Sequence, residues 1–266
     1  MKPTRAAVLA LCVGCAADLC TKTEADFISE QFNRDGGLWT TRCPDAVWLH
    51  TWTTLANDEP SRCLPDRAPR ALIVGGNKGF DCAGWASLLA GGGHNLSKAS
   101  WATALDAALL KIEGVKRANP NGACGQGDLT SGAEYPTLLR AASQQTPPEP
   151  AVTCVEALPS NSAVLVAAAS AVPWRAHLRV VAAAATSAAH AGTMSLPSGL
   201  AFGIEQIGFQ NRDHRASDHA FADVRAVTVD ELVREDLGGH VPLVLTIDTE
   251  GSDALVLEGA RTTLAR

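Results

Sequence analysis

The chain has 266 residues, of which 46% are hydrophobic, with a formal net charge of -6 and a pI near 5.6. This length and hydrophobic content are sufficient for one sizeable core, in one elaborated domain or in two. The acidic balance and the scattered Lys and Arg residues argue against nucleic-acid binding, which needs a basic stripe that follows phosphates. No uncharged apolar run reaches about eighteen residues, so the sequence predicts no transmembrane helix.

The first residues are typical of a secretory signal peptide. Lys2 and Arg5 give a basic start, residues 6–13 form a short apolar core, and the small residues at 14–17 suit a cleavage site. We therefore expect residues 1–17 to be a signal peptide and the protein to be in the secretory pathway or extracellular. An organelle lumen, reached through a transit segment, and a plain N-terminal helix are the alternatives.

The cysteines fit an oxidising compartment. Cleavage after Ala17 would remove two of the 8 cysteines and leave an even set, namely Cys20, Cys43, Cys63, Cys82, Cys124 and Cys154. These could form up to three disulfides, and the sequence leaves their pairing open. Asn95 begins an Asn-Leu-Ser glycosylation acceptor that would be used only in that compartment. There is no Cys-x2-Cys pair, so we predict no metal site.

Residues 18–70 are rich in Trp, Pro and Cys and are predicted to form an N-terminal cap segment and linker. Trp48 and Trp52 share one face of a short predicted helix. Such a pair packs a helix onto a core or, less often, lines a ligand pocket. The Pro-rich stretch at 60–69 is interpreted as a linker into a sheet.

The first predicted strand is the apolar run at 71–74, which breaks into the glycine-rich turn Gly75, Gly76, Asn77, Lys78 and Gly79. A helix is expected from Phe80 onward. Glycines let a ligand approach the backbone closely, and the N–H groups of such a turn can receive a carboxylate or phosphate. The turn is therefore a candidate ligand-binding loop.

An insertion of about residues 91–150 follows this helix. Gly79 and Glu156 are separated by far more residues than the roughly twenty of a minimal nucleotide-binding unit. Within the insertion, residues 99–112 have the apolar spacing of a helix that includes Trp101. The insertion is either a lid over the sheet edge that selects the substrate or a surface decoration.

The second predicted strand, 152–156, ends on an acidic residue, Glu156, and a helix at 160–172 follows it. An acid at the end of the second strand holds a nucleotide ribose in doubly wound folds. We expected the Glu156 side chain to lie outside the core. After a third strand at 178–181, small residues around Ala184 either let an adenine ring approach the backbone or reflect compositional bias.

The apolar run at 243–247 stops on two carboxylates, Asp248 and Glu250, and a helix capped by Ser252 or Asp253 is expected after a glycine turn. Ligands of open α/β sheets collect beyond the carboxyl ends of their strands. We therefore predict Asp248 and Glu250 to be catalytic, against the alternative of an acid that only caps a helix.

Together these segments resemble the FkbM-type S-adenosylmethionine-dependent methyltransferases, particularly the forms of algae and other microbial eukaryotes. The resemblance covers about residues 71–266, with low similarity in the insertion. One departure is Ile73, where members usually carry an acid two residues before the first glycine. The matching segments are the turn at 75–79, Glu156 with Pro159 and Asn161, the Val-Thr-Val-Asp-Glu-Leu run at 227–232, and Asp248, Glu250 and Gly251 followed by Gly259 and Ala260.

The resemblance implies an α/β fold with a Rossmann-like class I methyltransferase sheet spanning residues 71–266. It also implies S-adenosylmethionine as cofactor and oxygen methylation of a sugar or small-molecule hydroxyl, with a small-molecule or glycan acceptor. The family continues into further strands, so we expect the chain to be a C-terminally truncated fragment. In this reading Gly75, Gly76, Asn77 and Gly79 hold the methionine portion, Glu156 the ribose and Ala184 the adenine, while Asp248 and Glu250 face the transferring methyl.

Two other classes remain open. A nicotinamide-dependent oxidoreductase would share the loop and the acid but needs a catalytic Tyr/Lys or His system, and the chain has a single tyrosine, Tyr135. A non-catalytic binding protein on a degenerate methyltransferase fold would explain Ile73. The acceptor and the oligomeric state are not encoded in any pattern that we can read.

Overall fold

The computed structural model describes residues 70–89, 98–116, 151–172, 177–203, 220–249 and 251–266. The predicted signal peptide, nearly all of the cap segment, Asn95, Tyr135 and Glu250 lie outside these residues.

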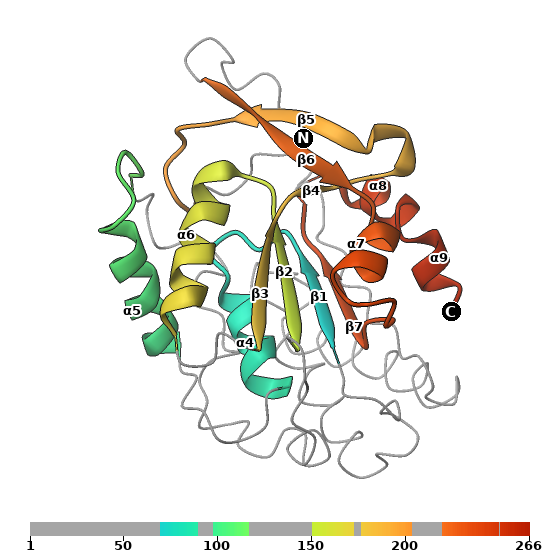
Figure 1. Ribbon diagram of the computed structural model, residues 1–266, viewed down its shortest axis with the longest axis horizontal. Helices are drawn as coiled ribbons and strands as arrows, with labels where there is room; N and C mark the ends of the chain where they lie inside the picture. The colour runs from blue at the N-terminus through green and yellow to red at the C-terminus, as the bar shows by residue number, and fades with distance from the viewer. Residues whose placement is uncertain (1–69, 90–97, 117–150, 173–176, 204–219, 250) are drawn as a thin grey trace, which may run out of the picture.

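Four parallel strands form the central sheet in the order β3-β2-β1-β7 (Figure 1). They are β1 (Ala71–Val74), β2 (Val152–Glu156), β3 (Leu178–Ala182) and β7 (Val244–Ile247). Every residue of β1 and β2 is buried, as expected for parallel strands that are covered on both faces. The predicted α/β class with a Rossmann-like sheet is confirmed.

Helices cover both faces of this sheet because successive strand residues point to opposite sides. Ile73 belongs to a core cluster with residues of α4 (Phe80–Leu89), α5 (Lys98–Leu109) and α6 (Pro159–Ala171). Leu72 and Val74 belong to a second cluster with residues of α7 (Val229–Glu235) and α8 (Asp253–Glu258). The short helix α9 (Arg261–Leu264) follows α8 directly.

A second, smaller sheet adjoins the carboxyl end of the first (Figure 1). It has the order β4-β6-β5, with β4 (Ala184–Ala185), β5 (Gly192–Pro197) and β6 (Phe221–Val227). Strand β4 begins two residues after β3 ends, so the main chain passes directly from one sheet to the other. A 3-10 turn, η3 (Ala188–His190), connects β4 to β5.

The described part of the insertion belongs to the core. Helix α5 packs on α6, and its Trp101 is 1% exposed. The Trp101 indole N–H donates to the Lys78 carbonyl oxygen at 2.9 Å. Helix α5 is therefore part of the core and is neither a lid nor a surface decoration. Residues 117–150 of the insertion lie outside the described ranges.

A disulfide joins Cys82 of α4 to Cys154 of β2, with the Cα atoms 5.7 Å apart. Both residues are almost completely buried. The structure thus contains a disulfide between two of the six cysteines whose pairing the sequence left open, and the bond attaches the helix after the glycine-rich turn to the neighbouring strand.

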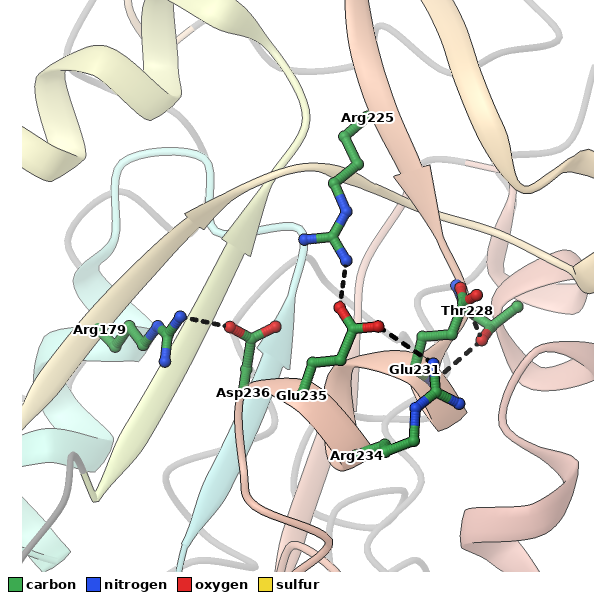
Figure 2. A network of polar contacts seen from close by, with 7 residues as sticks. All are labelled: Arg179, Arg225, Thr228, Glu231, Arg234, Glu235 and Asp236. Carbon is green, nitrogen blue, oxygen red and sulfur yellow. Dashed lines mark hydrogen bonds and ion pairs between the residues drawn. The ribbon is translucent and has the colours of Figure 1, made fainter.

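Charged side chains attach α7 to both sheets (Figure 2). Arg179 of β3 pairs with Asp236 at 2.6 Å, and the Asp236 side chain is 5% exposed. Arg225 of β6 pairs with Glu235 at 2.5 Å, and Arg234 lies 3.1 Å from the same carboxylate. At the other end of α7, Thr228 and Glu231 form a reciprocal capping box.

Within the described ranges, every helix is too short or too polar to cross a lipid bilayer.

Candidate active site

The glycine-rich turn crosses the end of β7 at very close range. A Cβ atom at Gly75 would lie 1.8 Å from the Asp248 carbonyl oxygen, so only glycine fits there. Gly75 has a φ of 92° and Asn77 a φ of 41°, both left-handed conformations that glycine and asparagine tolerate best. The turn therefore lies beside Asp248.

The other two glycines of the turn face the core. A Cβ atom at Gly76 would lie 2.6 Å from the Cys154 sulfur, and one at Gly79 would lie 2.7 Å from Leu165. The buried disulfide thus lies directly against the turn at Gly76. Packing alone requires glycine at these positions, in addition to any role in ligand binding.

Glu156 lies at the carboxyl end of β2 and is only 5% exposed. Its Oε2 accepts the Asn77 backbone N–H at 2.6 Å, and its Oε1 accepts the Leu158 backbone N–H at 2.8 Å. Burial raises the pKa of this carboxyl, and hydrogen bonds from Leu158, Asn77 and Asn161 oppose that effect. The expectation that this side chain lies outside the core is wrong, because it is enclosed by the turns after β1 and β2.

Asp248 and Asp253 have different roles after β7. Asp248 is exposed, and its backbone N–H donates to the Val74 carbonyl oxygen at 2.9 Å. Asp253 accepts the Thr249 backbone N–H at 2.8 Å and the Thr249 hydroxyl at 2.6 Å, so it holds the turn. Ser252 occupies the N-cap position of α8 without a side-chain cap bond. The predicted side-chain cap of α8 is therefore not formed, and Asp253 instead accepts hydrogen bonds from Thr249 in the preceding turn.

Ala184 follows the end of β3 and is 1% exposed. Its neighbour Ala183 donates a backbone N–H to the Glu156 carbonyl oxygen at 3.1 Å, which brings this stretch beside the end of β2. Ala184 packs with Leu196 and Val224 of the small sheet. The small side chain thus allows the two sheets to approach each other next to Glu156.

Ile73 is 2% exposed and belongs to the apolar cluster under α4 and α6. This position, where the family resemblance leads us to expect an acid, therefore contributes to the core.

Asn161 was noticed in the sequence only as part of the turn after β2. In the structure it is 1% exposed, and its Oδ1 accepts the Gly203 backbone N–H at 2.9 Å. Its Nδ2 lies 3.4 Å from the Asn77 Oδ1. The sequence signal that could have revealed this role is an asparagine near the start of a helix that is otherwise rich in Ala and Val. Such an amide needs hydrogen-bond partners if it is buried.

The fold thus brings the turn after β1, Glu156, the stretch at Ala184 and Asp248 to one edge of the central sheet. In the described part of the chain, no group of His, Cys, Asp and Glu residues has the arrangement of a metal site. An α/β sheet with a glycine-rich turn after β1 and an acid at the end of β2 is the arrangement of a nucleotide- or cofactor-binding domain.

The profile of the methyltransferase FkbM domain matches residues 123–266, which is more than half of the chain. The protein therefore belongs to the FkbM methyltransferase family, and the predicted resemblance is confirmed. The matched segment includes Glu156, Ala184 and Asp248 and begins after the turn at 75–79. Comparison with curated proteins and with solved structures gives no match.

Proposed function

We propose that the protein is an S-adenosylmethionine-dependent methyltransferase that methylates a hydroxyl oxygen of a sugar or small molecule. The observation that carries this proposal is the Glu156 carboxylate, which is buried at the end of β2 and hydrogen-bonded to the Asn77 N–H of the turn after β1. Membership of the FkbM methyltransferase family supports the reaction class.

The residues at the sheet edge fit an adenosyl cofactor. A carboxylate has about four acceptor sites, and Glu156 already accepts hydrogen bonds from Asn77, Leu158 and Asn161. In the proposed complex the ribose hydroxyls bind to this same carboxylate. Gly75, Gly76, Asn77 and Gly79 would hold the methionine portion, and Ala184 would lie near the adenine. When bound, this cofactor supplies an activated methyl group on a sulfonium.

Asp248 is assigned as the proton acceptor for the substrate hydroxyl. It is exposed at the end of β7, and its backbone lies against Gly75, which supports a place beside the proposed cofactor loop. A hydroxyl nucleophile loses its proton as it attacks, and a carboxylate within hydrogen-bonding reach can take that proton. Glu250 lies outside the described residues, and its role in orienting the acceptor stays a prediction.

A cofactor-free binding role is the second candidate, and Ile73 is the observation that favours it. An apolar, 2% exposed side chain stands where the family resemblance leads us to expect an acid near the methionine amino group. An oxidoreductase reading would instead require a catalytic Tyr/Lys or His system, and the single tyrosine, Tyr135, lies outside the described residues.

Titration calorimetry of the full chain with S-adenosylmethionine and with NAD tests these alternatives. We expect binding of S-adenosylmethionine at micromolar concentration and none of NAD. Transfer of labelled methyl to hydroxyl-bearing acceptors, tried as monosaccharides, glycans and small alcohols, then tests the reaction. Binding of neither cofactor would leave the non-catalytic reading, and binding of NAD alone would support the oxidoreductase.

We also propose that the protein resides in the secretory pathway or outside the cell. The signal-like residues 1–17 and the Cys82–Cys154 disulfide support an oxidising compartment.

A further inference from the structure

Asn161 connects three parts of the chain through one buried amide. It is near the start of α6, and its Oδ1 and Nδ2 contact residues that are 42 and 84 positions away in the sequence. The same side chain also hydrogen-bonds to Glu156. A buried amide costs free energy unless its donors and acceptor are paired, and here both ends of the amide are paired with different segments.

The partner on the oxygen side is the turn that contains Phe202 and Gly203. Gly203 has a φ of 79°, and a Cβ atom there would lie 2.7 Å from the Cε atom of Lys78. The Lys78 side chain therefore packs on the α-carbon of Gly203. Phe202 is 5% exposed, and its backbone N–H donates to the Lys116 carbonyl oxygen at 2.6 Å. The Phe202–Gly203 turn is thus packed directly on the glycine-rich turn.

The partner on the nitrogen side is the glycine-rich turn itself. The Asn161 Nδ2 donates to the Asn77 Oδ1 at 3.4 Å, while the Asn77 backbone N–H donates to Glu156 at 2.6 Å. Asn77 is held from two sides in a left-handed conformation that costs a non-glycine residue free energy.

We propose that Asn161 is a positioning residue that locks the glycine-rich turn, Glu156 and the Phe202–Gly203 turn into one arrangement that is competent to bind the cofactor. This inference rests on the proposed function, in which Asn77 and Glu156 contact the cofactor. Asn161 acts through them. Neighbouring Ser162 differs, because its hydroxyl donates to the Pro159 carbonyl oxygen of its own helix turn.

Two substitutions distinguish the role of the Asn161 amide oxygen from that of its amide nitrogen. Asn161→Asp keeps an acceptor for the Gly203 N–H, loses the donor to Asn77 and places a second carboxylate beside Glu156. Asn161→Leu has a similar volume and removes both ends. Ser162→Ala, one residue further along α6, is the matched control because Ser162 is also buried and its hydroxyl donates to the Pro159 carbonyl oxygen of its own helix turn.

The measurements are amide hydrogen exchange at Asn77 and Gly203 without ligand, and the Kd for S-adenosylmethionine. In Asn161→Asp we expect faster exchange at Asn77, near-normal exchange at Gly203 and a Kd raised about tenfold or more. In Asn161→Leu both amides exchange faster, and Ser162→Ala behaves as wild type. Far-UV circular dichroism and the melting temperature establish that each variant is folded.

Unchanged exchange at Asn77 in a folded Asn161→Asp protein would overturn the inference, whatever the cofactor affinity. Equal acceleration at Asn77, Gly203 and the core amides in both variants would also overturn it, because that pattern reports general destabilisation. If the wild type binds no S-adenosylmethionine, the proposed function fails and the cofactor part of the inference fails with it. The exchange data still decide whether Asn161 couples the two turns.

Discussion

At the scale of single residues, the Glu156 carboxylate has both a proposed ligand contact and a structural role. The carboxylate is a candidate ribose acceptor, and it also accepts two backbone N–H groups in a site where it is 5% exposed. Its loss should therefore affect both the ligand and the fold.

Glu156→Ala is expected to weaken S-adenosylmethionine binding by about 1.5–3 kcal/mol, because a charge-assisted contact is lost. It should also lower the free energy of unfolding, since the N–H groups of Asn77 and Leu158 lose their acceptor. Calorimetry measures the first effect and denaturant unfolding the second. A folded variant with wild-type affinity would contradict the ribose assignment.

The pH dependence of this site follows from the raised pKa of Glu156. A carboxyl group whose pKa is higher in the folded state than in the unfolded state stabilises the folded state when it is protonated. This contribution to stability is therefore lost as the pH rises from the usual Glu pKa of 4.5 through the raised pKa of the folded state. The cofactor-free wild type should therefore gain stability relative to Glu156→Ala as pH falls toward 4.5. Melting temperatures of the two proteins across this range test the sign.

Asp248 is expected to act in the reaction and to contribute little to the fold. Asp248→Asn should preserve cofactor binding and lower turnover roughly a hundredfold or more, the scale of a positioned proton acceptor. Asp253→Ala is the comparison, because Asp253 holds the turn through Thr249 and should cost mainly stability. Full turnover by Asp248→Asn on a confirmed acceptor would show that the carboxylate is not the base.

At the scale of elements, Asp230 attaches α7 to α9. Its carboxylate accepts the Thr262 and Thr263 backbone N–H groups at 3.0 and 2.7 Å and the Thr263 hydroxyl at 2.8 Å. These donors belong to the first turn of α9, so Asp230 caps a helix that lies 32 residues further along the chain. Partial burial raises the pKa of Asp230, but the hydrogen bonds from Thr262 and Thr263 lower it more.

Asp230→Ala should cost about 1 kcal/mol of stability, the usual scale for a lost helix cap. The pKa of Asp230 is lowered in the folded state, so the ionised carboxylate stabilises the fold. This stabilisation is fully present at pH values above the usual Asp pKa of 3.8 and is lost as the pH falls below it. The difference in melting temperature between wild type and variant should therefore narrow below about pH 4. Glu235→Ala is the control, since its ion pairs are exposed and should contribute little (Figure 2).

At the scale of the whole molecule, the Cys82–Cys154 bond connects the helix after β1 to the middle of β2. Both cysteines are buried against the turn at Gly76, so the bond stabilises the surroundings of the glycine-rich turn.

Protein recovered from a secretory host should contain the Cys82–Cys154 bond, should migrate differently with and without reductant, and should carry a glycan at Asn95. Peptide mapping by mass spectrometry identifies the pairing and the N-terminus. Free thiols at every cysteine together with an intact N-terminus would instead assign the protein to a reducing compartment.

Local sequence patterns predicted the central features of this fold. Short apolar runs predicted β1, β2, β3 and β7, and the glycine-rich turn and Glu156 were correctly placed after the first two strands. These predictions succeed because a buried parallel strand needs consecutive apolar residues and because close backbone approach requires glycine.

Only the tertiary structure decided which distant groups meet. The pairing of Cys82 with Cys154, the cap that Asp230 gives to α9, the position of α5 in the core and the contacts of Asn161 all join segments far apart in sequence. The amino-acid sequence does not show whether a given carboxylate or amide is solvated or buried. Its partners exist only once the sheet order and the helix packing bring them within hydrogen-bonding distance.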